Sequence, residues 1–174
     1  TGNTTLKNIQ PLFADLIGGG IACSHNGNLT NGIELRKNLV KRGAIFQSTT
    51  DTEALLHLIA QSKKSTMIKK IIDALFGLEG AYSIGLLTNK KLIAIKDPLG
   101  IRPLVMGELK GAKIIASETC ALDIIGAKYI RDLDNGEIVV MDKNGVKSYK
   151  PFNKVSARPC IFEYIYFARP DSIM

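Results

Sequence analysis

The chain has 174 residues, of which 45% are hydrophobic and 22% charged, a composition typical of one soluble globular domain. Its apolar runs are all shorter than the roughly 18 residues that a membrane span needs, and its three cysteines are too few for a disulfide scaffold. We therefore expect no membrane partner and a reducing, cytoplasmic location. The net charge of +7 comes from scattered lysine pairs without interleaved aromatic residues, so no nucleic-acid partner is expected.

The first predicted elements surround the motif SHNGNLTN at residues 24–31. The short apolar stretch at residues 21–23 predicts a strand that ends at this motif. Asn26 and Gly27 are the residues that a tight hairpin turn favours, so a turn is expected here. Asn31 is a suitable N-cap for a first helix.

Two further helices are expected after a brief strand at residues 44–46. Thr50 and Glu53 have the spacing of a capping box at the start of the second helix. The third helix is expected over residues 66–76, where apolar residues recur at helical spacing.

From residue 81 onward the apolar period becomes that of strands. A short helix is expected near residues 119–125, and hairpins are expected farther on, with turns at residues 134–136 and 143–145. Helices and antiparallel strands that are segregated in this way predict a compact α+β domain. Four of the predicted strands carry the sequences AYSIGLL, KLIAIK, RPLVMG and KIIAS.

Two polar segments carry the residues best suited to catalysis. The side-chain amide of Asn26 and the backbone N–H of Gly27 are donors of the kind that form an oxyanion hole for acyl chemistry. Asp51, at the start of a helix, is placed to receive a substrate ammonium group. The structural alternatives are a plain turn at Asn26-Gly27 and a first-turn acid favoured by the helix dipole at Asp51. From spacing alone, both readings stay open.

At these two segments the sequence also resembles a known family. SHNGNLTN and STTDTE are similar to the glutamine-binding loops of class II glutamine amidotransferases, the type with an N-terminal nucleophile. LEGAYSIGLL, KDPLGIRPLVMG and ASETCALD continue the similarity in the same order, and PCIFEYIYFARPDS resembles the amidophosphoribosyltransferases within that class. The similarity covers essentially the whole chain.

The resemblance implies a four-layer αββα sandwich of the N-terminal-nucleophile hydrolase type, incomplete at its N-terminus. Residues 1–155 would be the glutaminase domain, and residues 156–174 the start of the connection to a phosphoribosyltransferase domain. In this family a cysteine at the mature N-terminus hydrolyses glutamine, and its own α-amine serves as the base. The ammonia displaces pyrophosphate from phosphoribosyl pyrophosphate to give 5-phosphoribosylamine, the first committed step of purine synthesis. The implied partners are these two substrates and, in the full-length protein, further copies in a homo-oligomer.

Carried over by motif, the resemblance assigns Asn26 and Gly27 to the oxyanion hole. It assigns Gly27 and Asp51 to glutamine binding, with Asp51 facing the α-amino group. The Asn-Gly turn is thus expected to be real and to carry the active-site donors. Thr1-Gly2 resembles the end of a loop of the RYSTTG type, which places the family's carboxylate-binding arginine and its nucleophilic cysteine upstream. We therefore expect an internal fragment that is inactive by itself.

Cys160 is the candidate metal ligand. In the iron–sulfur branch of the family, a cysteine just before EYIYF ligates a [4Fe-4S] cluster, with the other ligands outside this sequence. A buried structural thiol is the alternative reading. Mg²⁺ would belong to the phosphoribosyltransferase site, also outside this sequence.

Two alternatives to this function stay open. One is another class II amidotransferase, such as glucosamine-6-phosphate synthase or asparagine synthetase, although the run FEYIYFARPDS argues against both. The other is a non-catalytic glutamine-binding or regulatory module that has lost its nucleophile.

Overall fold

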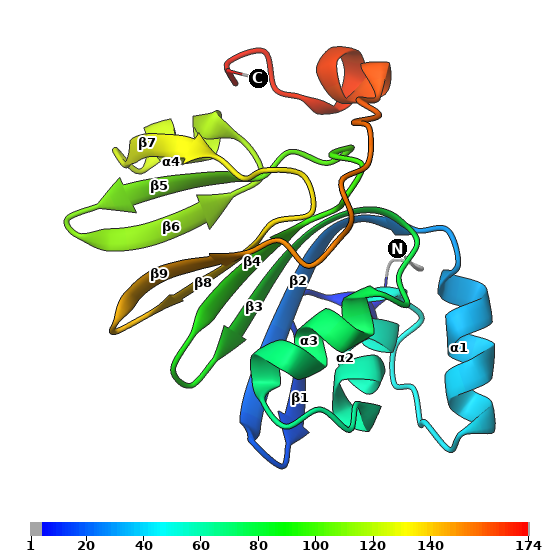
Figure 1. Ribbon diagram of the computed structural model, residues 1–174. Helices are drawn as coiled ribbons and strands as arrows, with labels where there is room; N and C mark the ends of the chain where they lie inside the picture. Colours follow the sequence, from blue (N-terminus) through cyan, green and yellow to red (C-terminus); the bar gives the residue numbers. More distant parts are fainter. Residues whose placement is uncertain (1–4, 174) are drawn as a thin grey trace.

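The computed structural model describes residues 5–173, which form two antiparallel sheets covered by helices (Figure 1). The Thr1-Gly2 pair, which resembles the end of a family loop, lies outside the described residues. Within the described part, no helix combines the length and apolar character that crossing a membrane requires.

The larger sheet has six strands in the order β1-β2-β3-β4-β8-β9, and every neighbouring pair is antiparallel. Its longest pairing joins β2 to β3, from Ile21 opposite Thr88 to Leu29 opposite Gly80. The strands are β1 (Leu12–Leu16), β2 (Gly19–Leu29), β3 (Gly80–Thr88), β4 (Leu92–Lys96), β8 (Ile138–Asp142) and β9 (Gly145–Tyr149).

The smaller sheet has three antiparallel strands in the order β6-β5-β7. Its strands are β5 (Val105–Leu109), β6 (Ala112–Ala116) and β7 (Lys128–Asp132), and a helix, α4 (Thr119–Ile124), joins β6 to β7. Two short helical turns lie near the ends of the chain, η1 (Leu6–Asn8) and η2 (Glu163–Phe167).

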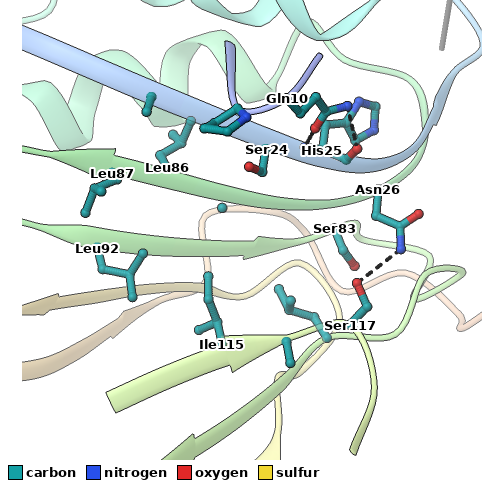
Figure 2. Close-up of a pocket in the computed structure, with 15 residues that line it drawn as sticks. Gln10, Ser24, His25, Asn26, Ser83, Leu86, Leu87, Leu92, Ile115 and Ser117 are labelled. Atoms are coloured by element: carbon teal, nitrogen blue, oxygen red, sulfur yellow. Dashed lines mark hydrogen bonds between the residues drawn. The ribbon is translucent and has the colours of Figure 1, made fainter. Parts of the chain in front are cut away.

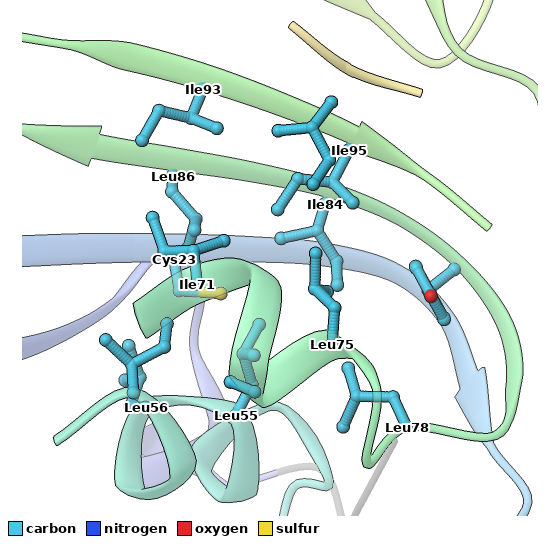
Figure 3. Close-up of a cluster of buried hydrophobic side chains, with 14 of the residues drawn as sticks. Cys23, Leu55, Leu56, Ile71, Leu75, Leu78, Ile84, Leu86, Ile93 and Ile95 are labelled. Atoms are coloured by element: carbon cyan, nitrogen blue, oxygen red, sulfur yellow. The ribbon is translucent and has the colours of Figure 1, made fainter. Parts of the chain in front are cut away.

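The main hydrophobic core lies between the larger sheet and the helices that follow β2 (Figure 3). These helices are α1 (Gly32–Lys41), α2 (Thr52–Gln61) and α3 (Met67–Leu75). Leu55 and Ile71 project from α2 and α3 toward Ile84 and Leu86 of β3. Burying each such side chain stabilises the fold by about 1.5–3 kcal/mol. The apolar stripes of α2 and α3 thus explain why these two helices cover the sheet.

The opposite face of the larger sheet packs on the smaller sheet. Ala94 and Val139 of the larger sheet share a second core with Met106 of β5. Val105, the residue before Met106, points to the opposite face of the smaller sheet because side chains alternate along a strand, and it packs there with Leu122 of α4. The molecule is therefore layered as helices, larger sheet, smaller sheet and α4.

The structure confirms the predicted α+β class, the three early helices, the short helix α4 and the four strands β3 to β6. Thr66 also caps α3 as a helix start should, since its hydroxyl accepts the Lys69 N–H at 3.3 Å. The turn predicted at residues 143–145 joins β8 to β9 as a hairpin.

The predicted turn at Asn26-Gly27 is wrong. Both residues lie inside β2, paired with Ser83 and Tyr82 of β3, and the strand runs on to Leu29. The Asn-Gly pair is therefore not a hairpin. The pairing with β3, a strand far along the chain, outweighs the local turn preference.

Three smaller expectations also differ from the structure, and one further strand was not expected. Residues 44–46 form no strand. The turn predicted at residues 134–136 is present, with the Glu137 N–H donating to the Asp134 carbonyl at 3.0 Å, but it connects β7 to β8 across two different sheets rather than within a hairpin. The capping box is absent because Glu53 instead accepts the backbone N–H groups of Gln47 and Ser48, each at 2.7 Å. Strand β1 was not expected: it is a short edge strand with an exposed Phe13.

Candidate active site

A cavity of about 480 Å³ lies between the two sheets, within the volume range of small-molecule sites (Figure 2). Its walls come from β2 and β3 on one side and from the end of β6 on the other. One end is apolar, with Leu87, Leu92 and Ile115. The other end is polar and holds Ser24, Asn26, Ser83 and Ser117.

Asn26 lies at the polar end, and both ends of its side-chain amide are engaged. Its Nδ2 donates to Ser117 Oγ at 3.1 Å, as Figure 2 shows, and its Oδ1 accepts a hydrogen bond from Arg102 Nη2 at 2.5 Å. The two partners come from the connections that follow β6 and β4. Loops of both sheets therefore hold this amide at the cavity wall.

Gly27 occupies a position that excludes any side chain. Its φ is +146°, and a Cβ built there would lie 2.1 Å from the carbonyl oxygen of Ala81. Only glycine allows β2 to lie this close to β3. Gly27 is not among the described residues that line the cavity, although it adjoins Asn26, which does.

Asp51 lies at the start of α2, beside the end of β2. Its Oδ2 accepts the backbone N–H of Leu29 at 2.7 Å, whereas its Oδ1 is buried without a hydrogen-bond partner among the described residues. His25 Nδ1 lies 3.7 Å from that free oxygen and 3.1 Å from Thr52 Oγ1. Asp51 is absent from the cavity wall, so the structure brings it together with His25 rather than with Asn26.

His25 is a buried imidazole whose Nδ1 hydrogen-bonds with Thr52 Oγ1 and whose Nε2 has no hydrogen-bond partner among the described residues. Burial lowers its pKa, and the nearby Asp51 carboxylate opposes that effect only in part. The ring is therefore neutral near pH 7, and the negative charge of Asp51 is not cancelled by a cationic neighbour. This leaves Asp51 free to attract a cation.

Arg102 and Ser117 are the site residues that sequence reasoning missed. Arg102 lies in the run DPLGIR, and the buried Asp97 organises this loop by accepting the backbone N–H groups of Ile101 and Arg102, each at 3.2 Å. Residues 97–100 form a turn, in which the Gly100 N–H donates to the Asp97 carbonyl at 3.1 Å. The spacing of Asp97, Gly100 and Arg102 in this run is the sequence feature that could have indicated a structured loop with an inward-facing arginine.

The cysteines supply no nucleophile to this cavity. Burial, reinforced by Asp51, raises the pKa of the Cys23 thiol to about 12, which keeps the thiol protonated and unreactive. Cys120 is also buried, and Cys160 is a half-buried free thiol. None of the three is among the residues that line the cavity.

The chain is similar to a known domain family and to known enzymes. The profile of the glutamine amidotransferase domain matches residues 3–123. The chain is 53% identical over its whole length to the amidophosphoribosyltransferase of Rhizobium etli. It is 50% identical over 99% of its length to the chloroplastic amidophosphoribosyltransferase 1 of Arabidopsis thaliana. It covers 36% and 31% of these two proteins, so it spans about a third of the curated relatives it matches.

Solved structures give the same picture. The glutamine phosphoribosylpyrophosphate amidotransferase of Bacillus subtilis, solved with ADP and GMP, matches with a TM-score of 0.94 and 41% identity, over 98% of this chain and 38% of that one. A glutamine aminotransferase class-II domain protein of Silicibacter pomeroyi matches at a TM-score of 0.56 and 13% identity, over 76% of this chain and 67% of that one. The second likeness concerns the fold alone.

Proposed function

This chain belongs to the glutamine amidotransferase domain family, and on that premise we propose that it forms the glutaminase part of an amidophosphoribosyltransferase. The fold is of the N-terminal-nucleophile type, with its four αββα layers completed by chain outside this sequence. The observation that carries the proposal is the amide of Asn26, held from two sides at the polar end of a cavity of substrate size.

In the proposed reaction, a cysteine thiolate outside this sequence attacks the side-chain carbonyl of glutamine, and its α-amine takes up and returns the proton. Ammonia leaves, and water then releases glutamate from the acyl-enzyme. The ammonia displaces pyrophosphate from phosphoribosyl pyrophosphate to give 5-phosphoribosylamine. The names of the relatives, which are amidophosphoribosyltransferases, support these two substrates and a role in purine synthesis.

Three residues of this chain take part in the proposed glutaminase step. Asn26 Nδ2 and the Gly27 N–H stabilise the negative charge that develops on the carbonyl oxygen. Gly27 also binds glutamine through its backbone; the absence of a side chain lets the backbone of β2 lie against Ala81 of β3 next to the cavity. Asp51 receives the α-ammonium group on its free Oδ1.

The wider organisation is proposed on the same basis. Residues 1–155 form the glutaminase domain, and residues 156–174 begin the connection to a phosphoribosyltransferase domain, whose site holds Mg²⁺. The exposed apolar side chains of Ile165 and Tyr166 support a connection that packs against more of the protein. We further propose a cytoplasmic homo-oligomer.

A [4Fe-4S] cluster does not fit the described residues by themselves. Within residues 5–173 no three His, Cys, Asp or Glu side chains lie close enough together to hold a metal ion. Cys160 could supply one thiolate of the four that such a cluster takes. No step of the reaction is assigned to a cluster.

Isotope transfer in the full-length protein tests the proposed function. With glutamine labelled by ¹⁵N in its amide and with phosphoribosyl pyrophosphate, we expect glutamate, pyrophosphate and labelled phosphoribosylamine in equal amounts. Asn26→Ala should lower kcat with glutamine by about 10²–10³-fold, because one oxyanion donor is lost. Pyrophosphate release driven by added ammonia should persist, since it bypasses the glutaminase step.

The matched control is Asn144→Ala, at an exposed asparagine in the β8–β9 turn, which should leave both activities unchanged. Hydrolysis of glutamine without transfer to phosphoribosyl pyrophosphate would indicate another class II amidotransferase. Absence of any hydrolysis by the full-length protein would indicate a non-catalytic module and overturn the proposal.

A further inference from the structure

Arg102 joins the candidate oxyanion donor to the C-terminal segment of the chain. Its Nη2 donates to Asn26 Oδ1, and its Nη1 donates to Glu163 Oε1, both at 2.5 Å. Its guanidinium carbon also lies 5.5 Å from the ring centre of Phe167, in the same helical turn η2 (orange-red in Figure 1). One side chain therefore bridges β2 and η2.

The chemistry of arginine decides which way the Asn26 amide points. A guanidinium group has only donors, so the amide must turn its oxygen toward Arg102 and its NH₂ group away from it. The NH₂ group then lies at the cavity, where one hydrogen reaches Ser117 Oγ and the other is available to a ligand. The hydrogen bond from the cationic group also polarises the amide, which makes that remaining N–H a stronger donor.

Arg102 is itself held firmly. The backbone N–H of Arg102 donates to Asp97 at 3.2 Å, and the side chain of Arg102 is only 15% exposed. The side chain of Glu163 is 7% exposed and can therefore hold the guanidinium group with little competition from water. A buried ion pair of this kind fixes geometry, because moving either partner would leave an unpaired buried charge.

The segment that carries Glu163 is anchored on both sides of η2. On one side, the Arg158 N–H donates to the carbonyl of Leu99, in the same loop as Arg102, at 2.9 Å. On the other side, the Arg169 N–H donates to Glu118 Oε2 at 2.9 Å, beside the start of α4. The position of Glu163 is thus set by the loops that also build the cavity wall.

We propose that Arg102 is a positioning residue for the glutaminase step: it orients the Asn26 amide with its NH₂ group toward the substrate, and Glu163 holds Arg102 in place. The proposal rests on the proposed function, because it assigns Arg102 to the same oxyanion site. It further makes the C-terminal segment part of the glutaminase machinery, although that segment lies far from Asn26 in the sequence.

A double-mutant cycle in the full-length enzyme tests this role. Arg102→Gln should lower kcat with glutamine by about 10–100-fold and change KM less than threefold, since the substrate is still bound. In the Asn26→Ala background the same substitution should lower kcat less than threefold further, because the group it orients is gone. Ammonia-dependent pyrophosphate release reports whether each variant is folded.

Glu163→Gln provides the second arm. It keeps the shape of the side chain but removes the charge, so we expect a loss of kcat of about 3–30-fold that also vanishes in the Asn26→Ala background. If Arg102→Gln has lost its ammonia-dependent activity and is therefore misfolded, the kinetics of Glu163→Gln decide whether Arg102 positions Asn26. Arg42→Gln is the matched control, at an exposed arginine directly after α1, and it should leave kcat unchanged.

The outcomes separate the two proposals. Equal losses in the wild-type and Asn26→Ala backgrounds, or unchanged kcat in both Arg102→Gln and Glu163→Gln, would overturn the positioning role while leaving the glutaminase function intact. A wild-type enzyme that does not hydrolyse glutamine would instead overturn the proposed function on which this role rests.

Discussion

Asp51 has one carboxylate oxygen occupied and one free. Leu29 donates its N–H to Oδ2, while Oδ1 is buried without a hydrogen-bond partner among the described residues. Buried polar atoms of this kind call for an explanation, because leaving them unpaired costs stability. The neighbouring His25 does not supply a positive charge, since burial lowers its pKa. The ammonium group of glutamine is the partner that we propose for this oxygen.

Removing this charge should weaken glutamine binding rather than slow the chemistry. Asp51→Asn in the full-length enzyme is expected to raise KM for glutamine by about 10–100-fold, since a charged hydrogen bond contributes about 1.5–3 kcal/mol. The value of kcat should change less than threefold. Steady-state kinetics measure both KM and kcat. Asp123→Asn, which changes an exposed acid of α4, is the control. An unchanged KM would remove Asp51 from the site.

Among the helices and strands, sequence patterns predicted those elements whose formation depends on residues close together in the chain. The helix α3 was predicted because its apolar residues recur at helical spacing and Thr66 caps it. Strand β2 was predicted only in part, because Asn26-Gly27 is locally a turn sequence. Gly27 is needed instead for its close approach to Ala81, a residue of β3, and this reason is invisible without the pairing of the two strands.

In the candidate site, too, sequence segments predicted some residues, whereas contacts between distant parts of the chain determine others. The resemblance of two sequence segments to a family predicted roles for Asn26 and Asp51, and the structure shows what each side chain contacts. Arg102 was missed because its partners, Asn26 and Glu163, lie 76 and 61 residues away, and no local pattern reports such contacts.

One buried carboxylate ties elements of both sheets together. Glu137, just before β8, accepts two hydrogen bonds from Arg131 of β7, at 2.7 and 2.8 Å, and one from Ser148 of β9 at 2.6 Å. Burial by itself would raise the pKa of Glu137, but these hydrogen bonds outweigh it and hold the pKa at about 2. The carboxylate is therefore ionised in the folded protein down to low pH.

This tie predicts a defined acid sensitivity. Because the pKa of Glu137 is lower in the folded state than the ordinary 4.5, its contribution is complete above about pH 4.5 and is lost as the pH falls toward 2. Glu137→Gln should lower the free energy of unfolding at pH 7 by about 1.5–3 kcal/mol and flatten its fall below pH 4.5. Unfolding of this domain between pH 2.5 and 7 measures both effects. If the free energy of unfolding of Glu137→Gln falls with pH as steeply as that of the wild type, the low pKa of Glu137 is contradicted. Glu34→Gln, which changes an exposed acid of α1, is the control.

At the scale of the whole molecule, the site lies where the layers meet. The smaller sheet packs on the larger one through Met106 and Val139, and the cavity opens between β2, β3 and β6. Its polar end is built by connections from both sheets, so the donor Asn26 depends on the packing of the two layers. Because the chain spans about a third of the length of its relatives, the full-length protein is the proper object of every test of activity.

The decisive measurement for the proposed glutamine site is a crystal structure of the full-length protein with glutamine bound, under conditions that prevent turnover. We expect the amide carbonyl oxygen of glutamine about 2.7–3.1 Å from Asn26 Nδ2 and the Gly27 nitrogen, with the α-ammonium group beside Asp51 Oδ1. Glutamine bound elsewhere, with Asn26 and Asp51 both without ligand, would contradict this expectation.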